Sequence, residues 1–224
     1  MMNASQNTQT REVVITLGEV TLRGDLQLVT GATGLVLFVH GSGSSRFSSR
    51  NRAVARDLQT GGLATLLFDL LSEEEERIDE YTRELRFDIP LLTERVIGVT
   101  EWLRRQPGTD DLAIGYFGAS TGAAAALEAA AYFADRPDVV KAVVSRGGRP
   151  DLALEALPRV AVPTLLIVGG DDGAVIGMNR QALEEIEAPK ELRIVAGATH
   201  LFEEPGTLEE VSRVAREWFK RYLS

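Results

Sequence analysis

Residues 112–126 read LAIGYFGASTGAAAA: a short apolar run, a turn of small residues and an alanine-rich segment. The apolar run predicts a buried strand at Leu112–Phe117, and the alanines predict a helix at Thr121–Phe133. Between them lies a Gly-x-Ser-x-Gly pattern centred on Ser120. A sharp strand-to-helix turn that exposes a serine hydroxyl requires small neighbours, so this stretch predicts a nucleophile elbow with Ser120 at its tip.

Strand and helix patterns alternate on both sides of this stretch. Two β-rich segments separated by Gly18 and Glu19 predict an opening antiparallel hairpin. Alternation after the hairpin predicts an α/β fold, with a mainly parallel sheet of about eight strands and helices on both faces. We interpret residues 1–11 as a flexible N-terminal segment and residues 12–224 as a single domain. The expected strands are Val13–Leu17, Val20–Val29, Leu35–Val39, Ala64–Phe68, Leu112–Phe117, Val139–Val144, Thr164–Val168 and Leu192–Val195, and the further helices are Asn51–Thr60, Ile89–Arg105, Val175–Ile186 and Thr207–Tyr222.

Two stretches interrupt the alternation. Ser72–Asp88 is rich in Glu and Arg, and a charge run of this kind is typical of a solvated excursion. Arg146–Pro163 is short, so no lid domain fits between its flanking strands. Ser72–Asp88 has room only for a smaller flap over an otherwise open, shallow site.

A serine at the start of an alanine-rich helix also suits a plain N-cap, so the elbow needs support from elsewhere. In this architecture an acid and then a histidine follow the serine along the chain. The chain has only two histidines, and only His200 follows Ser120, in a loop after the last strand. Asp171 and Asp172 follow the strand Thr164–Val168, and either carboxylate can orient the imidazole of His200.

An oxyanion that forms on the substrate needs two preorganised N–H donors. The Thr121 amide, directly after Ser120, supplies one, and the Ser42 amide in the loop after Leu35–Val39 supplies the other. His40, at the start of that loop, is interpreted as structural. A dinucleotide-binding interpretation of the loop fails because Arg46 replaces the third glycine. We expect no organic cofactor and no metal, because two distant histidines and no cysteines give no ligand spacing.

The composition of the chain limits the classes of partner and the chemistry that we expect for it. The 224 residues carry a formal charge of −9, which disfavours nucleic acid and anionic membrane surfaces. The absence of cysteine excludes thiol chemistry. The polar start of the chain and the lack of a long apolar run make a cytoplasmic location the expectation.

Several stretches resemble the α/β-hydrolase superfamily, and in particular its small, lidless branch related to dienelactone hydrolase. They are HGSGSSRFSSRNR from His40, FGASTG from Phe117, SRGGRPDLA from Ser145, LIVGGDD from Leu166 and GATHLFEEPG from Gly197. The resemblance implies that Asp172 rather than Asp171 is the acid. It departs at the nucleophile, where true dienelactone hydrolases have cysteine and this chain has Ser120, so simple carboxylic esters are the expected substrates.

The sequence therefore predicts a serine carboxylesterase-like hydrolase with the triad Ser120, Asp172 and His200. Acyl transfer or amide cleavage by the same triad, and a non-catalytic binding module, are the alternatives. Arg46 and Arg146 are candidates to bind a substrate carboxylate, although arginines at such edges commonly form surface ion pairs. The expected partner is a small-molecule ester, and a homodimer is an assembly that the sequence leaves open.

Overall fold

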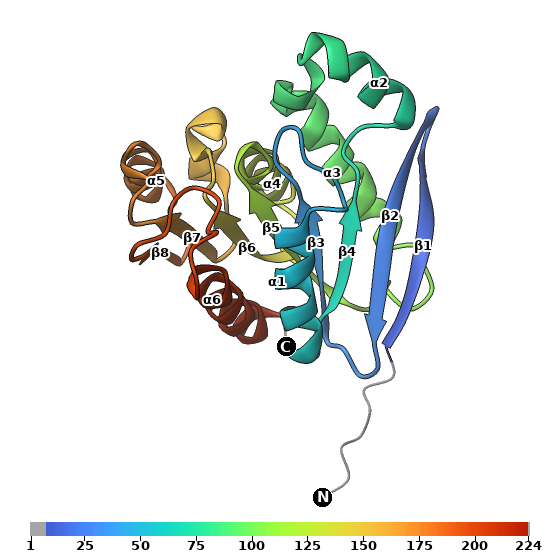
Figure 1. The fold of residues 1–224 in the computed structure, drawn as a ribbon. Coiled ribbons are helices and arrows are strands. Elements are labelled where there is room, and N and C mark those ends of the chain that lie inside the picture. Colours follow the sequence, from blue (N-terminus) through green and yellow to red (C-terminus); the bar gives the residue numbers. More distant parts are fainter. Residues whose placement is uncertain (1–7, 224) are drawn as a thin grey trace, which may run out of the picture.

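The structure is a computed structural model, and it describes residues 8–223. These residues form a single eight-stranded sheet in the order β1-β2-β4-β3-β5-β6-β7-β8. Figure 1 shows the sheet with helices packed on both of its faces. The strands are β1 (Thr8–Leu17), β2 (Val20–Val29), β3 (Gly34–Val39), β4 (Ala64–Phe68), β5 (Ala113–Ala119), β6 (Val140–Arg146), β7 (Thr164–Gly169) and β8 (Lys190–Val195).

The first two strands form the predicted antiparallel hairpin. Leu17 pairs with Val20 across a two-residue turn, where Gly18 adopts a φ of +63° that suits glycine. Strand β1 begins at Thr8, four residues before the expected start of the domain at residue 12, and Arg11 pairs with Leu26. The rest of the expected flexible segment, residues 1–7, lies outside the described residues.

The other strands run parallel to one another, and β2 joins them by antiparallel pairing with β4. Strands β3, β4 and β7 are buried along their whole length, as expected for central strands covered on both faces. One face packs against α3 (Ile89–Leu103), α4 (Thr121–Tyr132) and α5 (Gly173–Glu185). The other face packs against α1 (Ser49–Thr60) and α6 (Thr207–Tyr222). The mainly parallel sheet, its hairpin and its helix-covered faces were all predicted.

The stretch Ser72–Asp88 differs from the prediction, because it contains helix α2 (Glu73–Thr82) and a short 3₁₀ turn, η1 (Leu85–Phe87). Ser72 begins α2 with a capping box, in which its hydroxyl accepts from the Glu75 amide while the Glu75 carboxylate accepts from the Ser72 amide. The run of glutamates lies at the helix N-terminus, where negative charge stabilises a helix. The sequence did not predict helix α2, because this helix has no apolar stripe.

The stretch Arg146–Pro163 contains two short 3₁₀ turns, η2 (Pro150–Ala153) and η3 (Leu157–Arg159). It adds no lid domain, in agreement with its length. Within residues 8–223, no helix is long and apolar enough to cross a bilayer.

Candidate active site

Ser120 lies at the tip of a strained turn between β5 and α4. Its φ of 51° and ψ of −123° form a combination that residues with a Cβ rarely adopt. The turn depends on Gly122, because a Cβ there would lie 2.3 Å from the main-chain oxygen of His40. This close approach holds the loop after β3 against the turn. Ser120 thus lies at a sharp strand-to-helix turn, the backbone geometry that a nucleophile elbow requires.

Asp172 and His200 meet at the carboxyl edge of the sheet. His200 Nδ1 lies 2.7 Å from Asp172 Oδ2. Because an ionised carboxylate only accepts hydrogen bonds, Nδ1 donates in this contact, and in a neutral imidazole the lone pair is then on Nε2. The side chain of His200 is 39% exposed and that of Asp172 is 16% exposed, so the pair is open to solvent on the imidazole side. This is the arrangement that prepares an imidazole to accept a proton at Nε2.

The main chain of β6 connects this pair to Ser120. The Ser120 amide donates to the carbonyl oxygen of Arg146 at 3.2 Å. The next residue, Gly147, lies against the imidazole, since a Cβ built on it would be 3.4 Å from His200 Cε1. Within residues 8–223 the Ser120 side chain makes no hydrogen bond. Ser120, Asp172 and His200 thus lie on the same edge of the sheet, and hydrogen bonding between their side chains is described only for His200 and Asp172.

Asp171 has a different environment from its neighbour. Its amide donates to the carbonyl oxygen of Ala198 at 2.9 Å, and its side chain is exposed. The preceding turn packs closely on the His200 loop, because a Cβ on Gly169 would lie 2.4 Å from the Ala198 oxygen. The structure therefore brings Asp172, and not Asp171, to the imidazole.

Glu204 is a residue of this region that the sequence analysis did not identify. Its carboxylate accepts from the Thr199 amide at 3.1 Å and from the Thr199 hydroxyl at 2.6 Å. These hydrogen bonds hold the pKa of Glu204 below its usual value. They close the loop that carries His200, in which Phe202 adopts a positive φ of 56°. The only signal in the sequence was an acid placed five residues after a threonine.

The loop after β3 is anchored by His40. Its Nδ1 lies 2.9 Å from the Gly41 oxygen, and its Nε2 accepts from the Leu70 amide at 3.1 Å. The Leu70 amide can only donate, so the ring is the neutral Nδ1–H tautomer. Burial lowers the pKa of His40 and favours this neutral form. His40 lies within the fold and connects two loops, which is the structural position predicted for it.

The two predicted oxyanion donors lie next to each other, but one is engaged. The Ser42 amide donates to the side-chain hydroxyl of Thr121 at 2.8 Å. The Thr121 amide opens α4, so it has no carbonyl partner within the helix. The main-chain N–H of Thr121 thus lies in the first turn of α4, whereas the N–H of Ser42 is bound to the Thr121 hydroxyl.

Arg46 does not lie free at the site. Its guanidinium pairs with Asp69 and lies 3.5 Å from both Asp25 and Glu12. Its main-chain amide also donates to Asp69, at 2.8 Å. Arg46 therefore holds together the loop after β3, the end of β4 and the hairpin.

Arg146 lies buried at the end of β6, with 6% of its surface exposed. Its guanidinium lies 5.8 Å from the centre of the Phe202 ring, and its Nη2 is 3.4 Å from Asn51 Oδ1. Burial lowers its pKa to about 10, and the charge of Arg50 acts in the same direction. No carboxylate of residues 8–223 forms an ion pair with it. The structure thus places Arg46 in an ion-pair network and Arg146 beneath the His200 loop.

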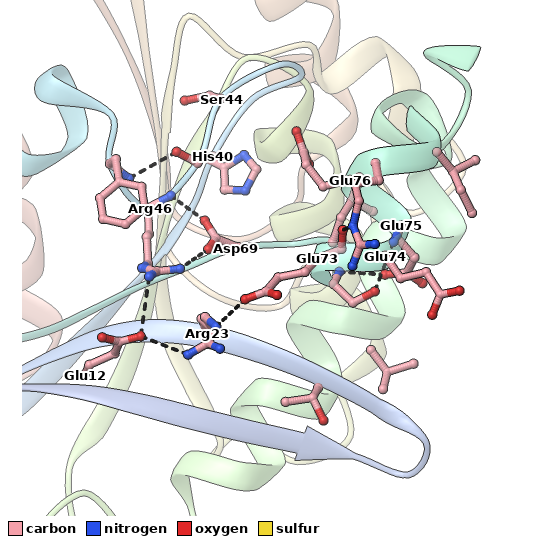
Figure 2. A pocket seen from close by; sticks show the side chains of 18 of the residues that line it. Glu12, Arg23, His40, Ser44, Arg46, Asp69, Glu73, Glu74, Glu75 and Glu76 are labelled. Atoms are coloured by element: carbon pink, nitrogen blue, oxygen red, sulfur yellow. Dashed lines mark hydrogen bonds and ion pairs between the residues drawn. The ribbon is translucent and has the colours of Figure 1, made fainter. Parts of the chain in front are cut away.

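A cavity of about 920 Å³ lies between the hairpin, the loop after β3 and α2 (Figure 2). Ion pairs cross its walls, with Arg23 bound to Glu12 and Glu73. Ser120, Asp172 and His200 are not part of its lining, although His40 is. This cavity is thus separate from the paired imidazole and carboxylate. Among residues 8–223 there is no group of three or more His, Asp or Glu side chains arranged to hold a metal ion.

The sheet order, the opening hairpin and the serine elbow define the class of protein as an α/β-hydrolase. Comparison with known proteins refines this class. Residues 43–223 match the model of the dienelactone hydrolase family, and the chain belongs to that family.

Two structures and one sequence illustrate the relationship. Dienelactone hydrolase from Anabaena variabilis, known from a crystal structure, is 59% identical in sequence to this chain. The two structures superpose with a TM-score of 0.94, and the match covers 97% of this chain and 99% of that one. Est1E from Butyrivibrio proteoclasticus is 16% identical, with a TM-score of 0.78 and coverage of 94% and 98%, and it shows a shared fold. A putative phosphoribosyl transferase of Mycobacterium tuberculosis is 55% identical over 212 residues, which cover 95% of this chain and 46% of that protein. The chain therefore spans about half the length of the curated relatives that it matches.

Proposed function

We propose that this chain is a serine hydrolase that cleaves small carboxylic esters through an acyl-enzyme intermediate on Ser120. The observation that supports it most directly is the 2.7 Å contact between His200 Nδ1 and Asp172, beside a serine held at a positive φ. Membership of a hydrolase family is consistent with this assignment. The name of the longer mycobacterial relatives describes proteins of which this chain matches 46%, so it is not transferred.

In the first half of the proposed reaction, Ser120 Oγ attacks the ester carbonyl carbon while His200 Nε2 takes the hydroxyl proton. Asp172 stabilises the imidazolium through the bond to Nδ1. The tetrahedral oxyanion then collapses, the bond to the leaving alkoxide breaks, and His200 returns the proton to the departing alcohol.

In the second half, a water molecule gives a proton to His200 Nε2 as its oxygen attacks the acyl carbon. The bond to Ser120 Oγ breaks, the proton returns to Ser120, and the carboxylic acid leaves. The strained elbow contributes by exposing the hydroxyl without any rearrangement of the main chain. No charged side chain besides the triad is required by these steps.

Labelling with a fluorophosphonate probe tests the nucleophile. The wild-type chain is expected to be labelled, and Ser120→Ala is expected to lose labelling and ester hydrolysis. Ser212→Ala is a matched control, because that hydroxyl bonds to Leu208 within α6, away from the site. Labelling that survives in Ser120→Ala would overturn the assignment.

A panel of p-nitrophenyl esters of increasing acyl length tests the substrate class. We expect the highest kcat/KM for short acyl groups, because no lid domain covers the site. Product analysis with added alcohol or amine separates hydrolysis from transfer to another acceptor. A preference for long acyl chains, or transfer as the main reaction, would contradict the proposed substrate class or the role of water.

A further inference from the structure

The hydroxyl of Thr121 occupies the position where an oxyanion would bind the Ser42 amide. Its Oγ1 lies 2.8 Å from the Ser42 nitrogen, within the range that a donor keeps from the oxygen it stabilises. Two oxygens cannot share one such position. A substrate oxyanion must therefore either displace the Thr121 side chain or bind to it.

The hydroxyl has one hydrogen available. A threonine hydroxyl is both a donor and an acceptor, and here it accepts from Ser42. Within residues 8–223 its own hydrogen is donated to no acceptor. Thr121 follows Ser120 directly, so its hydroxyl belongs to the same strand-to-helix turn as the proposed nucleophile.

Displacement is the less favourable of the two routes. Thr121 is 4% exposed, and rotating its side chain away breaks its hydrogen bond with Ser42 and leaves the Ser42 amide without that partner. Its branched Cβ also restricts the side-chain rotamers. Binding to the hydroxyl requires no movement, and preorganised donors are the ones that accelerate acyl transfer most.

We propose that the oxyanion hole consists of the main-chain N–H and the side-chain O–H of Thr121, with Ser42 as the residue that positions the hydroxyl. The Ser42 amide fixes Oγ1 and polarises its O–H bond, since hydrogen bonds in a chain strengthen one another. The hydroxyl then donates a hydrogen bond to the former carbonyl oxygen as negative charge develops on it. This inference rests on the proposed ester hydrolysis at Ser120.

Variants at Thr121 distinguish the two routes. Thr121→Val keeps the shape and removes the hydroxyl, and it is expected to lower kcat about 100-fold with little change in KM, as for loss of one oxyanion donor. Thr121→Ser keeps the hydroxyl and is expected to remain within about threefold of wild type. If the side chain merely leaves its place, Thr121→Val frees the Ser42 amide, and kcat is unchanged or higher; that result would overturn the proposal.

Binding of a trifluoromethyl ketone gives a second measurement, because its adduct with Ser120 carries an oxyanion. The Ki in Thr121→Val is expected to rise by the same factor as kcat/KM falls, and Thr121→Ser is expected to restore it. A purely structural role for Thr121 would weaken substrate binding as well, or lower the melting temperature. Thr60→Val is a matched control, because that hydroxyl bonds to Asp57 at the end of α1.

The wild-type chain separates this inference from the proposed function. A wild-type chain that neither hydrolyses esters nor reacts with fluorophosphonate would overturn both. An active wild-type chain whose Thr121→Val variant has unchanged kcat and Ki would overturn only the role of the hydroxyl.

Discussion

The loop from His40 to Ser48 separates two regions of the carboxyl edge with contrasting polar chemistry. On one side, Asp172 and His200 form a single oriented pair beside an uncharged elbow. On the other side, a cavity of about 920 Å³ is lined by many charges that pair with one another, Arg46 with Asp69 among them (Figure 2). The cavity has many charged side chains, whereas the region of Asp172 and His200 has a hydrogen-bonded pair suited to proton transfer. Orientation of a few groups, rather than the size of a cavity, identifies the candidate active site.

The largest effect is expected at Asp172, the proposed acid of the triad. Asp172→Asn is expected to lower kcat about 1,000-fold, because an amide cannot hold the imidazole in the required tautomer as a carboxylate does. Asp171→Asn, at the exposed neighbour, is expected to change kcat less than about fivefold. Ester hydrolysis at saturating substrate measures both. Equal losses in the two variants would remove the distinction drawn from the 2.7 Å contact.

The next largest effect is expected from substitutions of Arg46 and Arg146, which are compared by the free energy of unfolding. Arg46→Met is expected to lower the free energy of unfolding by about 2–3 kcal/mol, because it leaves the partly buried carboxylate of Asp69 without its cation. For Arg146, burial lowers the pKa to about 10, which implies a penalty on the order of 3 kcal/mol on the charged form at neutral pH. Arg146→Met is therefore expected to leave stability unchanged or to raise it. Urea unfolding measures both, and a loss in Arg146→Met that matches Arg46→Met would show that the buried cation is stabilised by its surroundings.

A smaller effect is expected from the hydrogen bonds that close the His200 loop. Glu204→Ala removes the acceptor for two groups of Thr199 and is expected to lower kcat/KM about tenfold by loosening the imidazole. Glu203→Ala is the control, because Glu203 forms an exposed pair with Arg50, and such pairs contribute little. An unchanged rate in Glu204→Ala would mean that Asp172 alone positions His200.

The smallest effect concerns His40, which lies between the two regions. Its pKa is lowered by burial from 6.5, while nearby Asp69 acts in the opposite direction. Below pH 6.5 the unfolded chain binds a proton that the folded chain does not, so stability is complete above this pH and falls as the pH decreases. The slope for one group is at most about 1.4 kcal/mol per pH unit. Urea unfolding at pH 7.5, 6.5 and 5.5 is expected to show a steeper loss in wild type than in His40→Gln, and equal slopes would contradict the buried neutral ring.

Most of the fold was predictable because its signals are local. Short apolar runs gave the central strands, and alternation gave the parallel sheet and its hairpin. The elbow was also readable, because only small residues allow the turn at Ser120. Helix α2 was missed because its start is encoded by a capping box at Ser72 rather than by an apolar stripe.

The features that were not predictable depend on contacts between distant residues. The bond from Ser42 to Thr121 joins residues 79 apart in sequence, so no local pattern encodes it. The burial of Arg146 follows from β6 continuing two residues beyond Val144, the expected end, which turns that side chain into the layer with α1 and Phe202. Nor did the choice between Asp171 and Asp172 follow from spacing, because neighbours in a turn point in different directions.

Strand β8 is an outermost strand of the sheet and is largely exposed. The loop that follows it carries the imidazole. Outer strands open at lower free energy than the core does, so brief fraying at this rim would separate His200 from its carboxylate while the rest of the sheet stays intact. Loss of catalytic competence on heating is therefore expected to precede the melting of the molecule.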